Sequence, residues 1–400
     1  MKKALILASV ASMVEAFNQE NITLLQKNGF EVHVMSNFHE DDHEKHTNNF
    51  DYKKKLEQIN VKVYDLPIQR NPLSRENLTV YYQVKKIFKE EDYALIHCHT
   101  PIGGVLGRLA AREIKKTGTQ VIYTAHGFHF FKGAPIKNWM IFYTVEKLLS
   151  SSTDCLITIN PEDYNNAVKK HFRMKDIELL NGVGINLNKF RPTTSLKRKT
   201  LREKYGYAEN DTILIYVGEL IKRKNQAQSI RMMSDLVKKY PQIKLLLVGD
   251  GQLIKEYSDM IEDLNLSDNI HLLGFRTDVA DLMSLSDICI STSRQEGLPV
   301  NIMEAMATGL PLVVTACRGN RDLVHDDING YIVDIDDHVK MADRISTLIQ
   351  NESLRARFGK RNTFFISPYE SRNVNMQMNN IYQRYTYPPA RLSVKDETQA

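Results

Sequence analysis

Short apolar segments alternate with segments of helical periodicity along the first half of the chain. Stretches such as Gly104 to Lys115 and Trp139 to Ser150 are long enough to form the helices that connect parallel strands. The pattern therefore predicts a doubly wound parallel sheet. Its expected strands are Ala4–Ala8, Phe30–Met35, Val61–Leu66, Ala94–His99, Gln120–Ala125, Cys155–Ile159 and Glu178–Leu180.

The same alternation starts again after a polar and basic run, Asn186 to Gly206, which we predict to be the linker between two domains. A chain of 400 residues is about twice the usual size of a single domain. We therefore expect an α/β protein with two Rossmann-like domains, residues 1–190 and 191–368, which face each other across a cleft built from strand-to-helix loops. In the second domain, strands are expected at Thr212–Val217, Lys244–Val248, Asn269–Leu273, Ile288–Ser291 and Leu312–Thr315, and helices are expected to begin near Asn225, Gln252, Val279, Pro299 and Asp337.

Composition limits the class of protein. The formal charge of +5, from 53 basic and 48 acidic residues, is spread along the chain and does not form the basic stripe of a nucleic-acid-binding protein. Four cysteines lie far apart, without the spacing of a disulfide framework or a zinc site, which predicts buried free thiols in a reducing compartment. These are Cys98, Cys155, Cys289 and Cys317. We therefore expect a cytoplasmic protein without a nucleic-acid partner.

The two ends of the chain need separate interpretation. Met1 to Met13 combines basic, apolar and small residues, as a signal peptide does. A helical pattern and a second strand follow it, so we interpret Ala4 to Ala8 as the first strand of the sheet. No stretch of the sequence is long and apolar enough to span a bilayer. The tail, 388–400, has little to bury and is predicted to be disordered.

The most informative segment, Ser293 to Arg318, reads SRQEGLPVNIMEAMATGLPLVVTACR. Glu296 and the three residues after it follow a strand and start a helix, whose free N–H groups and dipole form a site for a diphosphate. Gly297 lets the backbone come close to a ligand. Glu296 lies beside the same pocket and must face sugar hydroxyls rather than phosphate. Glu304, further along the helix, can accept hydrogen bonds from two ribose hydroxyls; the alternative is a charge on the helix surface.

This segment resembles the E-x7-E signature of the retaining family 4 glycosyltransferases of GT-B fold. Other matches in the second half are Val217–Leu220 with Lys224, Val248–Gly251, Leu273–Phe275 followed by Val279, Gly309–Val314 and Asn329–Gly330. The first half resembles bacterial capsule and exopolysaccharide glycosyltransferases at His97–Pro101, Thr124–Gly133 and Asn181–Gly184. The resemblance covers about residues 2 to 385, and it implies that the last helix, Tyr369 to Tyr385, crosses back to the first domain.

The resemblance also implies roles for the matching residues. Glu296 would contact the donor sugar and His126 would lie by the hydroxyls of the transferred sugar, so these two are the catalytic candidates. Lys224 would neutralise the diphosphate. Arg70 and His99 are the acceptor-binding candidates, with an ordinary polar position as the alternative for each. The donor-binding candidates are Gly218, Arg223, Lys224, Gly249, Phe275, Val279, Gly297, Leu298, Val300 and Glu304.

Several features depart from the family pattern or need a separate interpretation. Many family members carry Arg where Glu219 stands, so Arg223 is a candidate replacement on the phosphates, with a simple exposed charge as the alternative. The first loop, Ser9 to Ser12, stands where a glycine-rich turn is common. Asp334 to Asp336 has the form of a D-x-D metal site, but we interpret it as a turn away from the donor loops and expect no metal cofactor. The aromatic residues and lysines of Phe128 to Tyr143 suit peripheral contact with the inner face of the membrane, and a helix core is the alternative.

With this resemblance, we predict a retaining hexosyltransferase. It would move a hexosyl or N-acetylhexosaminyl group from a UDP-sugar to a polyprenyl-diphosphate-linked sugar acceptor in capsule or exopolysaccharide assembly. Front-face attack is the expected mechanism, with the departing diphosphate helping to deprotonate the acceptor. Two alternatives stay open: a sugar-nucleotide epimerase of the same fold, and a catalytically inactive partner subunit of a glycosyltransferase complex. A dehydrogenase is disfavoured because no G-x-G-x-x-G follows the first strand.

Overall fold

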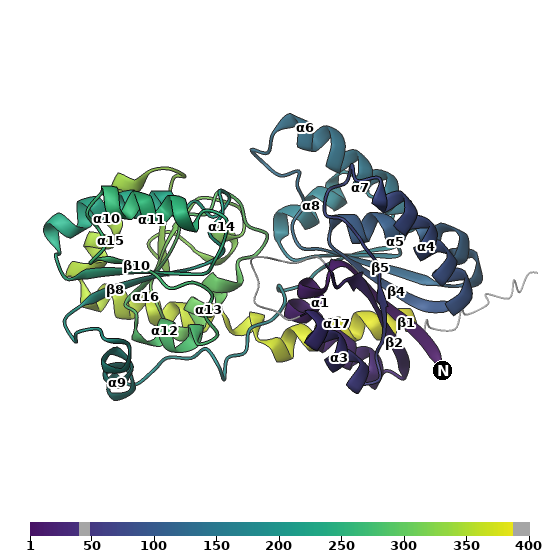
Figure 1. Ribbon diagram of the computed structural model, residues 1–400, viewed down its shortest axis with the longest axis horizontal. Helices are drawn as coiled ribbons and strands as arrows, with labels where there is room; N and C mark the ends of the chain where they lie inside the picture. The colour runs from purple at the N-terminus through teal and green to yellow at the C-terminus, as the bar shows by residue number, and fades with distance from the viewer. Residues whose placement is uncertain (40–48, 387–400) are drawn as a thin grey trace, which may run out of the picture.

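The computed structural model describes residues 1–39 and 49–386, which form two α/β domains side by side (Figure 1). The predicted disordered tail, 388–400, lies outside the described residues. The first domain contains a seven-stranded sheet in the order β3-β2-β1-β4-β5-β6-β7, and all neighbouring strands are parallel. All seven predicted strands are therefore confirmed. They are β1 (Lys2–Val10), β2 (Phe30–Asn37), β3 (Lys62–Asp65), β4 (Tyr93–His99), β5 (Gln120–Ala125), β6 (Cys155–Thr158) and β7 (Asp176–Leu179).

Helices cover both faces of the first sheet, as the doubly wound prediction requires (Figure 1). On one face lie α1 (Ala11–Phe17), α2 (Gln19–Lys27), α3 (Asn49–Gln58) and α17 (Ser371–Thr386). On the other face lie α4 (Glu76–Glu91), α5 (Pro101–Ile114), α7 (Thr144–Leu149) and α8 (Pro161–Lys169). Short helical turns complete the domain: η1 (Lys115–Thr117), α6 (Ile136–Asn138), the π-helical η2 (Trp139–Tyr143) and η3 (Ser150–Ser152).

The second domain contains a six-stranded sheet in the order β10-β9-β8-β11-β12-β13, again with parallel neighbours. Its strands are β8 (Thr212–Val217), β9 (Ile243–Val248), β10 (Ile270–Leu272), β11 (Ile288–Ser291), β12 (Leu312–Thr315) and β13 (Gly330–Val333). Its helices are α9 (Ser195–Tyr205), α10 (Gln226–Lys239), α11 (Ile254–Asp263), α12 (Val279–Leu285), α13 (Val300–Thr308), α14 (Asn320–Leu323), α15 (His338–Gln350) and α16 (Glu352–Phe365), followed by the turn η4 (Ser367–Tyr369).

The start of the chain is a core strand. Ala4 to Ala8 are fully buried in the middle of the first sheet, which confirms their interpretation as the first strand. The four cysteines are buried and free, as predicted. In the described part of the chain, no helix has the length and apolar character needed to cross a membrane.

The linker prediction is wrong for its second half, because residues 195–205 form helix α9. Thr194 caps the amino end through its side chain, and Gly206 ends the helix with a φ of 78°. Helix α9 buries little apolar surface, and Arg202 anchors it through a 2.7 Å bond to Asp287 and bonds to backbone carbonyls. Because Arg202, rather than a stripe of apolar side chains, holds α9 in place, the helix could not be recognised from hydrophobic periodicity.

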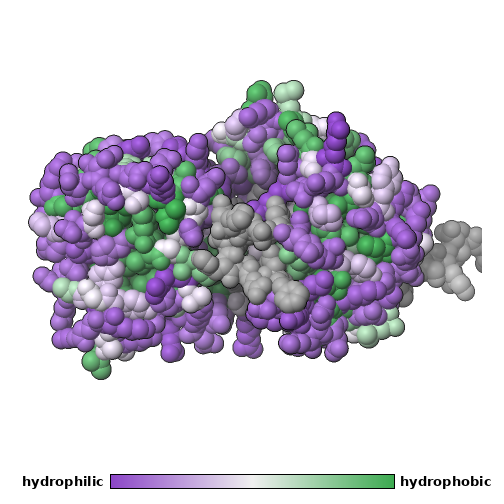
Figure 2. All heavy atoms as spheres, viewed as in Figure 1, coloured by the Kyte–Doolittle hydropathy of each residue, from purple (hydrophilic) through white to green (hydrophobic). Residues whose placement is uncertain are grey.

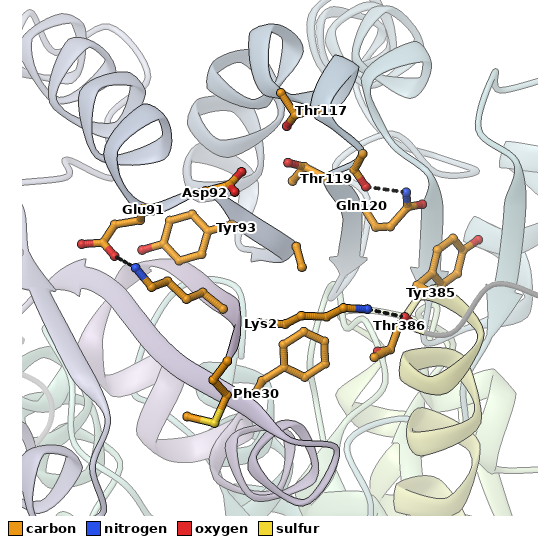
Figure 3. Close-up of a pocket in the computed structure, with 14 residues that line it drawn as sticks. Lys2, Phe30, Glu91, Asp92, Tyr93, Thr117, Thr119, Gln120, Tyr385 and Thr386 are labelled. Carbon is orange, nitrogen blue, oxygen red and sulfur yellow. Dashed lines mark hydrogen bonds and ion pairs between the residues drawn. The ribbon is translucent and has the colours of Figure 1, made fainter.

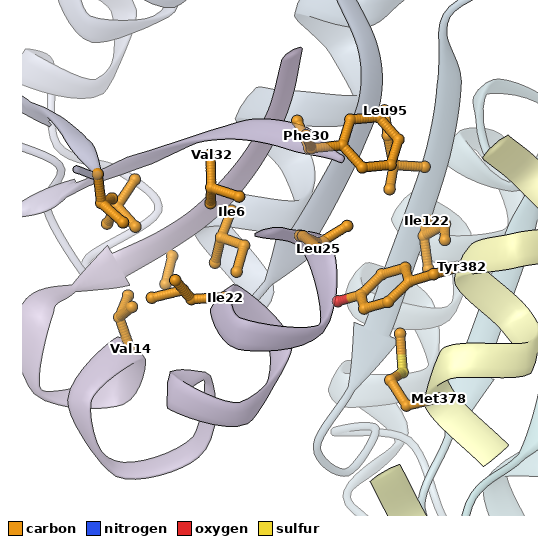
Figure 4. Packing of buried hydrophobic residues seen from close by; sticks show 14 of the residues in the cluster. Ile6, Val14, Ile22, Leu25, Phe30, Val32, Leu95, Ile122, Met378 and Tyr382 are labelled. Carbon is orange, nitrogen blue, oxygen red and sulfur yellow. The ribbon is translucent and has the colours of Figure 1, made fainter. Parts of the chain in front are cut away.

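Helix α17 brings the end of the chain into the core of the first domain. Met378 and Tyr382 pack with residues of α2, β1 and β5, as Figure 4 shows. The Tyr382 hydroxyl lies 2.7 Å from Nδ1 of His97 on β4. Because α17 leaves the second domain and packs in the first, the chain crosses between the domains twice.

Candidate active site

The two domains meet where the strands of both sheets end. Two glycines, Gly127 after β5 and Gly297 before α13, face each other at this meeting point. A side chain on Gly297 would place its Cβ 2.1 Å from the carbonyl oxygen of His126, and one on Gly127 would place its Cβ 3.1 Å from Gly297 Cα. Only glycine allows this approach. The Glu296 loop is therefore held directly against the His126 loop of the first domain.

Glu296 is the centre of a buried polar cluster. Its side chain is 7% exposed, and its Oε1 accepts hydrogen bonds from Lys224 Nζ at 2.7 Å and from Ser293 Oγ at 2.6 Å. Arg223 Nη1 lies 3.3 Å from Oε2. Burial would raise the pKa of Glu296, but the charges of Lys224 and Arg223 hold that pKa below its usual value. Glu296 is therefore an ionised and rigidly oriented acceptor of hydrogen bonds.

The loop that carries Arg223 and Lys224 follows β8, and it is fastened to the loop after β11. Arg294 N donates to the Arg223 carbonyl at 2.8 Å, and the Tyr216 hydroxyl donates to the Lys224 carbonyl at 2.7 Å. Asn301 of α13 donates to the carbonyl of Val217 at 2.7 Å. These bonds bring the two predicted phosphate-binding cations to the amino end of α13, where free N–H groups and the helix dipole favour an anion.

Some of the other donor-binding candidates are packed inside the second domain, and others lie on its surface. Gly249 has a φ of 143°, and a Cβ there would lie 2.2 Å from the carbonyl oxygen of Gly218, so these two glycines let neighbouring loops touch. Leu298 is 8% exposed and belongs to the hydrophobic core. Phe275, in contrast, is 44% exposed after β10. Val279 and Val300 are the first residues of α12 and α13 and are partly buried.

Glu304 lies on α13, two turns beyond Glu296, and is largely buried. Within the part of the chain that the structure describes, no group donates a hydrogen bond to its carboxylate. Burial raises the pKa of Glu304 to about 7, and the charge of Lys189 only partly opposes this effect. A carboxylate that is desolvated and unpaired is suited to accept hydrogen bonds from a ligand.

The rings of three histidines, His97, His99 and His126, lie next to one another between α17 and the loop after β5. His97 lies between the Tyr382 hydroxyl and Thr124 Oγ1, which is 2.8 Å from its Nε2. His99 Nδ1 lies 3.1 Å from His126 Nε2, and the other ring nitrogen of His99 is buried without a partner in the described structure. Burial lowers the pKa of His126 to about 4 and that of His97 to about 3. The three rings are therefore neutral at pH 7, and His126 offers a neutral imidazole rather than a charge.

A buried ion pair between the domains was not anticipated from the sequence. Arg318, after β12, lies 2.6 Å from Asp163 of α8, and both side chains are at most 2% exposed. The same guanidinium donates to the carbonyls of Glu296 and Phe128, each at 3.1 Å. The sequence signal for this pair is an arginine directly after the apolar run LPLVVTAC. A charged side chain at the end of a buried strand needs a partner of opposite charge.

Two predicted features lie apart from this cluster or differ from expectation. Arg70 is exposed in the loop between β3 and α4. The turn predicted at Asp334 to Asp336 is present, but its placement away from the donor loops is wrong, because Asp336 pairs with Arg294 at 2.6 Å. In residues 1–39 and 49–386, no group of three or more His, Cys, Asp or Glu side chains could hold a metal ion.

A further hollow of about 700 Å³ lies at the opposite edge of the first sheet (Figure 3). It is lined by Lys2, Lys3, Glu91 and Tyr93, and Lys3 is paired with Glu91 at 2.6 Å. Doubly wound sheets bind ligands at the carboxyl ends of their strands, whereas this hollow lies at the amino ends. The candidate site is therefore the polar cluster around Glu296, where the two domains meet.

Two facing parallel sheets with a polar site between their strand ends define the GT-B architecture. Residues 197–363 match the family model "Glycosyl transferases group 1", and residues 4–160 match "Glycosyl transferase 4-like". EpsD of Bacillus subtilis (strain 168), a protein named as a glycosyltransferase, is 38% identical over 384 residues, which cover 96% of this chain and 97% of EpsD. The chain therefore belongs to the family 4 glycosyltransferases of GT-B fold, as its motifs indicated.

Two further similarities extend this comparison. An Escherichia coli protein named UDP-Gal:alpha-D-GlcNAc-diphosphoundecaprenol alpha-1,3-galactosyltransferase is 31% identical over 262 residues, which cover 63% of this chain and 65% of that protein. The crystal structure of HepE from Anabaena in complex with UDP-glucose has a TM-score of 0.74 at 20% identity and covers 96% of this chain and all of HepE (100%). The second similarity shows the fold alone.

The buried pair predicts strong energetic coupling between the domains. Arg318→Met should lower the free energy of unfolding by about 3 to 5 kcal/mol, because Asp163 is left buried and uncompensated. Asp163→Asn should lower the free energy of unfolding of the wild type by at least 1 kcal/mol more than it lowers that of the Arg318→Met variant. Urea unfolding of the four proteins measures both quantities. Strictly additive losses would contradict the pair, and Arg294→Met, which breaks the exposed pair with Asp336, should cost less than about 1 kcal/mol.

The raised pKa of Glu304 predicts a pH-dependent effect of Glu304→Gln on stability. The unfolded chain loses this proton near pH 4.5 and the folded protein near pH 7, so stability is lost as pH rises between these values. Glutamine carries no charge at any pH. Glu304→Gln should therefore raise the melting temperature more at pH 8 than at pH 5, as measured by calorimetry. An equal change at both pH values would contradict the assignment, and Glu262→Gln on the exposed face of α11 is the matched control.

Proposed function

We propose that the protein transfers a hexosyl or N-acetylhexosaminyl group from a UDP-sugar, with retention, to a polyprenyl-diphosphate-linked sugar during capsule or exopolysaccharide assembly. The acceptor class is supported by the galactosyltransferase relative, whose name includes a diphosphoundecaprenol-linked sugar. The UDP donor is supported by the same name and by the UDP-glucose bound to HepE. Because the acceptor would be a membrane lipid, the proposed location is the cytoplasm, with peripheral contact at the inner face of the cell membrane.

The observation that carries the proposal is the position of Glu296. Its carboxylate is buried at the amino end of α13, it is bonded to Lys224, Arg223 and Ser293, and its loop touches that of His126. A sugar placed here meets an ionised carboxylate on one side and a neutral imidazole on the other. Both are acceptors for hydroxyl groups, and His126 can also donate. The diphosphate would lie over the helix end beside the two cations.

The pairing of Lys224 and Arg223 with Glu296 has a chemical consequence. When the sugar–phosphate bond breaks, negative charge develops on the leaving nucleoside diphosphate, and these two cations are positioned to stabilise it. The proposal requires no metal ion for this step. Glu296 already accepts three hydrogen bonds, so it serves as an orienting group rather than as a nucleophile. Retention then follows from front-face attack, in which the departing diphosphate takes the proton of the acceptor hydroxyl.

Release of nucleoside diphosphate from a panel of UDP- and GDP-sugars tests the proposal, with and without a bacterial polyprenyl-lipid extract. We expect release from a UDP-sugar that increases when the extract is added. Glu304→Ala should lower kcat/KM at least tenfold, because hydrogen bonds from both ribose hydroxyls to a charged group are lost. Glu262→Ala, at an exposed helix position, should leave the rate unchanged.

Three other outcomes would contradict the proposal. Release that does not depend on the extract, with conversion of the sugar to an epimer, would indicate the sugar-nucleotide epimerase. No release from any donor would favour an inactive partner subunit. A covalent sugar adduct trapped on Glu296 would exclude front-face attack.

A further inference from the structure

A polar groove adjoins the Glu296 loop at Gln295. Its volume is about 650 Å³, and it is formed by the first-domain segment Phe131 to Gly133 and by second-domain loops after β8, β11, β12 and β13. Its lining contains six cationic side chains and no acidic one. The cations are Lys132, Lys222, Arg223, Arg294, Arg318 and Arg321. Such a concentration of one sign of charge in a cleft attracts an anionic ligand.

Half of these cations have partners and half do not. Arg223, Arg294 and Arg318 are paired with Glu296, Asp336 and Asp163. Within residues 1–39 and 49–386, no carboxylate forms an ion pair with the side chain of Lys132, Lys222 or Arg321, although Glu162 Oε1 accepts a hydrogen bond from the backbone N–H of Lys132 at 2.6 Å. These three side chains are exposed. These three side chains give the groove an excess of positive charge that favours an anionic ligand.

The groove is one residue away from the sugar-facing carboxylate. Gln295 lines the groove, and Arg223 donates to the Gln295 carbonyl at 3.0 Å while also contacting Glu296. The loop after β8, which carries the donor-binding candidates Arg223 and Lys224, also contributes Lys222 and Arg223 to the groove. A ligand in the groove would therefore lie beside the leaving diphosphate, and front-face attack requires the acceptor on that same face of the donor sugar.

An apolar surface adjoins the groove. Lys132 and Gly133 lead directly into α6 and η2, where Ile136, Met140 and Ile141 are 79%, 70% and 59% exposed. Figure 2 shows hydrophobic atoms at the top of the molecule, where Figure 1 places α6. Exposed apolar groups beside a basic cleft match a ligand with an anionic head and an apolar chain.

We infer that this groove binds the diphosphate of a lipid-linked acceptor, with the isoprenoid chain leaving across α6 and η2. The inference rests on the proposed function for the acceptor class, and it adds the position of the diphosphate and the residues that hold it. Lys132 and Arg321 come from different domains. The ligand would therefore be bound by both sides of the closed cleft.

Binding of farnesyl diphosphate to the full chain, with saturating UDP present to occupy the donor site, tests the inference by calorimetry. The wild type should bind farnesyl diphosphate at least tenfold more tightly than the double variant Lys132→Ala/Arg321→Ala. It should also bind this ligand more tightly than inorganic diphosphate or farnesol. Lys360→Ala/Arg361→Ala, which removes the same charge from the exposed face of α16, should bind like the wild type.

Equal affinity of the wild type and the groove variant for farnesyl diphosphate would overturn the inference. It would also be overturned if the variant lost affinity only for phosphatidylglycerol vesicles, since the groove would then bind membrane headgroups. The assay measures no sugar transfer. A failure of the proposed function, seen as no nucleotide release, is therefore distinguishable from a failure of the groove.

Discussion

The ion pair between Arg318 and Asp163 is the interaction on which the arrangement of the cleft depends. Two charges at most 2% exposed are costly to bury, and the geometry here repays that cost with additional bonds from Arg318 to two backbone carbonyls. One of these carbonyls belongs to Glu296 and the other to Phe128. The pair therefore fixes the loop before α13 against the loop after β5, and the facing glycines Gly127 and Gly297 make that contact sterically possible.

Some charged side chains around this contact are paired and others are not. The unpaired ones indicate which ligand groups the protein could bind there. Lys224 and Arg223 are paired with Glu296, while Glu304 on the following helix α13 has no partner among the described residues and a pKa raised to about 7. In the groove beside Gln295, the side chains of Lys132, Lys222 and Arg321 have no ion-pair partner among the described residues. A nucleotide with ribose hydroxyls suits the first environment and a second anion suits the other. In our account, the nucleotide therefore lies along α13 and the acceptor diphosphate lies in the groove beside Gln295, with Arg223 next to both.

The two sheets and the E-x7-E motif could be predicted from the sequence, because both depend on local patterns. Strands such as β1 are continuous apolar runs, and Glu296 lies five residues after the last residue of one of them, β11. Helix α9 was missed because Arg202 rather than an apolar stripe anchors it. The Arg318 pair was missed because its partner lies 155 residues away in the other domain. Leu298 stays a donor-binding prediction, and only the folded chain shows that its side chain belongs to the core.

Amide hydrogen exchange of the full chain with and without UDP tests the central claim most directly, namely that the second domain holds the nucleotide at the start of α13 and beside Lys224. We predict slower exchange with UDP in peptides that cover the loops after β8 and β9 and the segment from Glu296 to Glu304. UMP should protect these loops less, since it lacks the second phosphate. Protection confined to the first domain, or no protection at saturating UDP, would contradict the account.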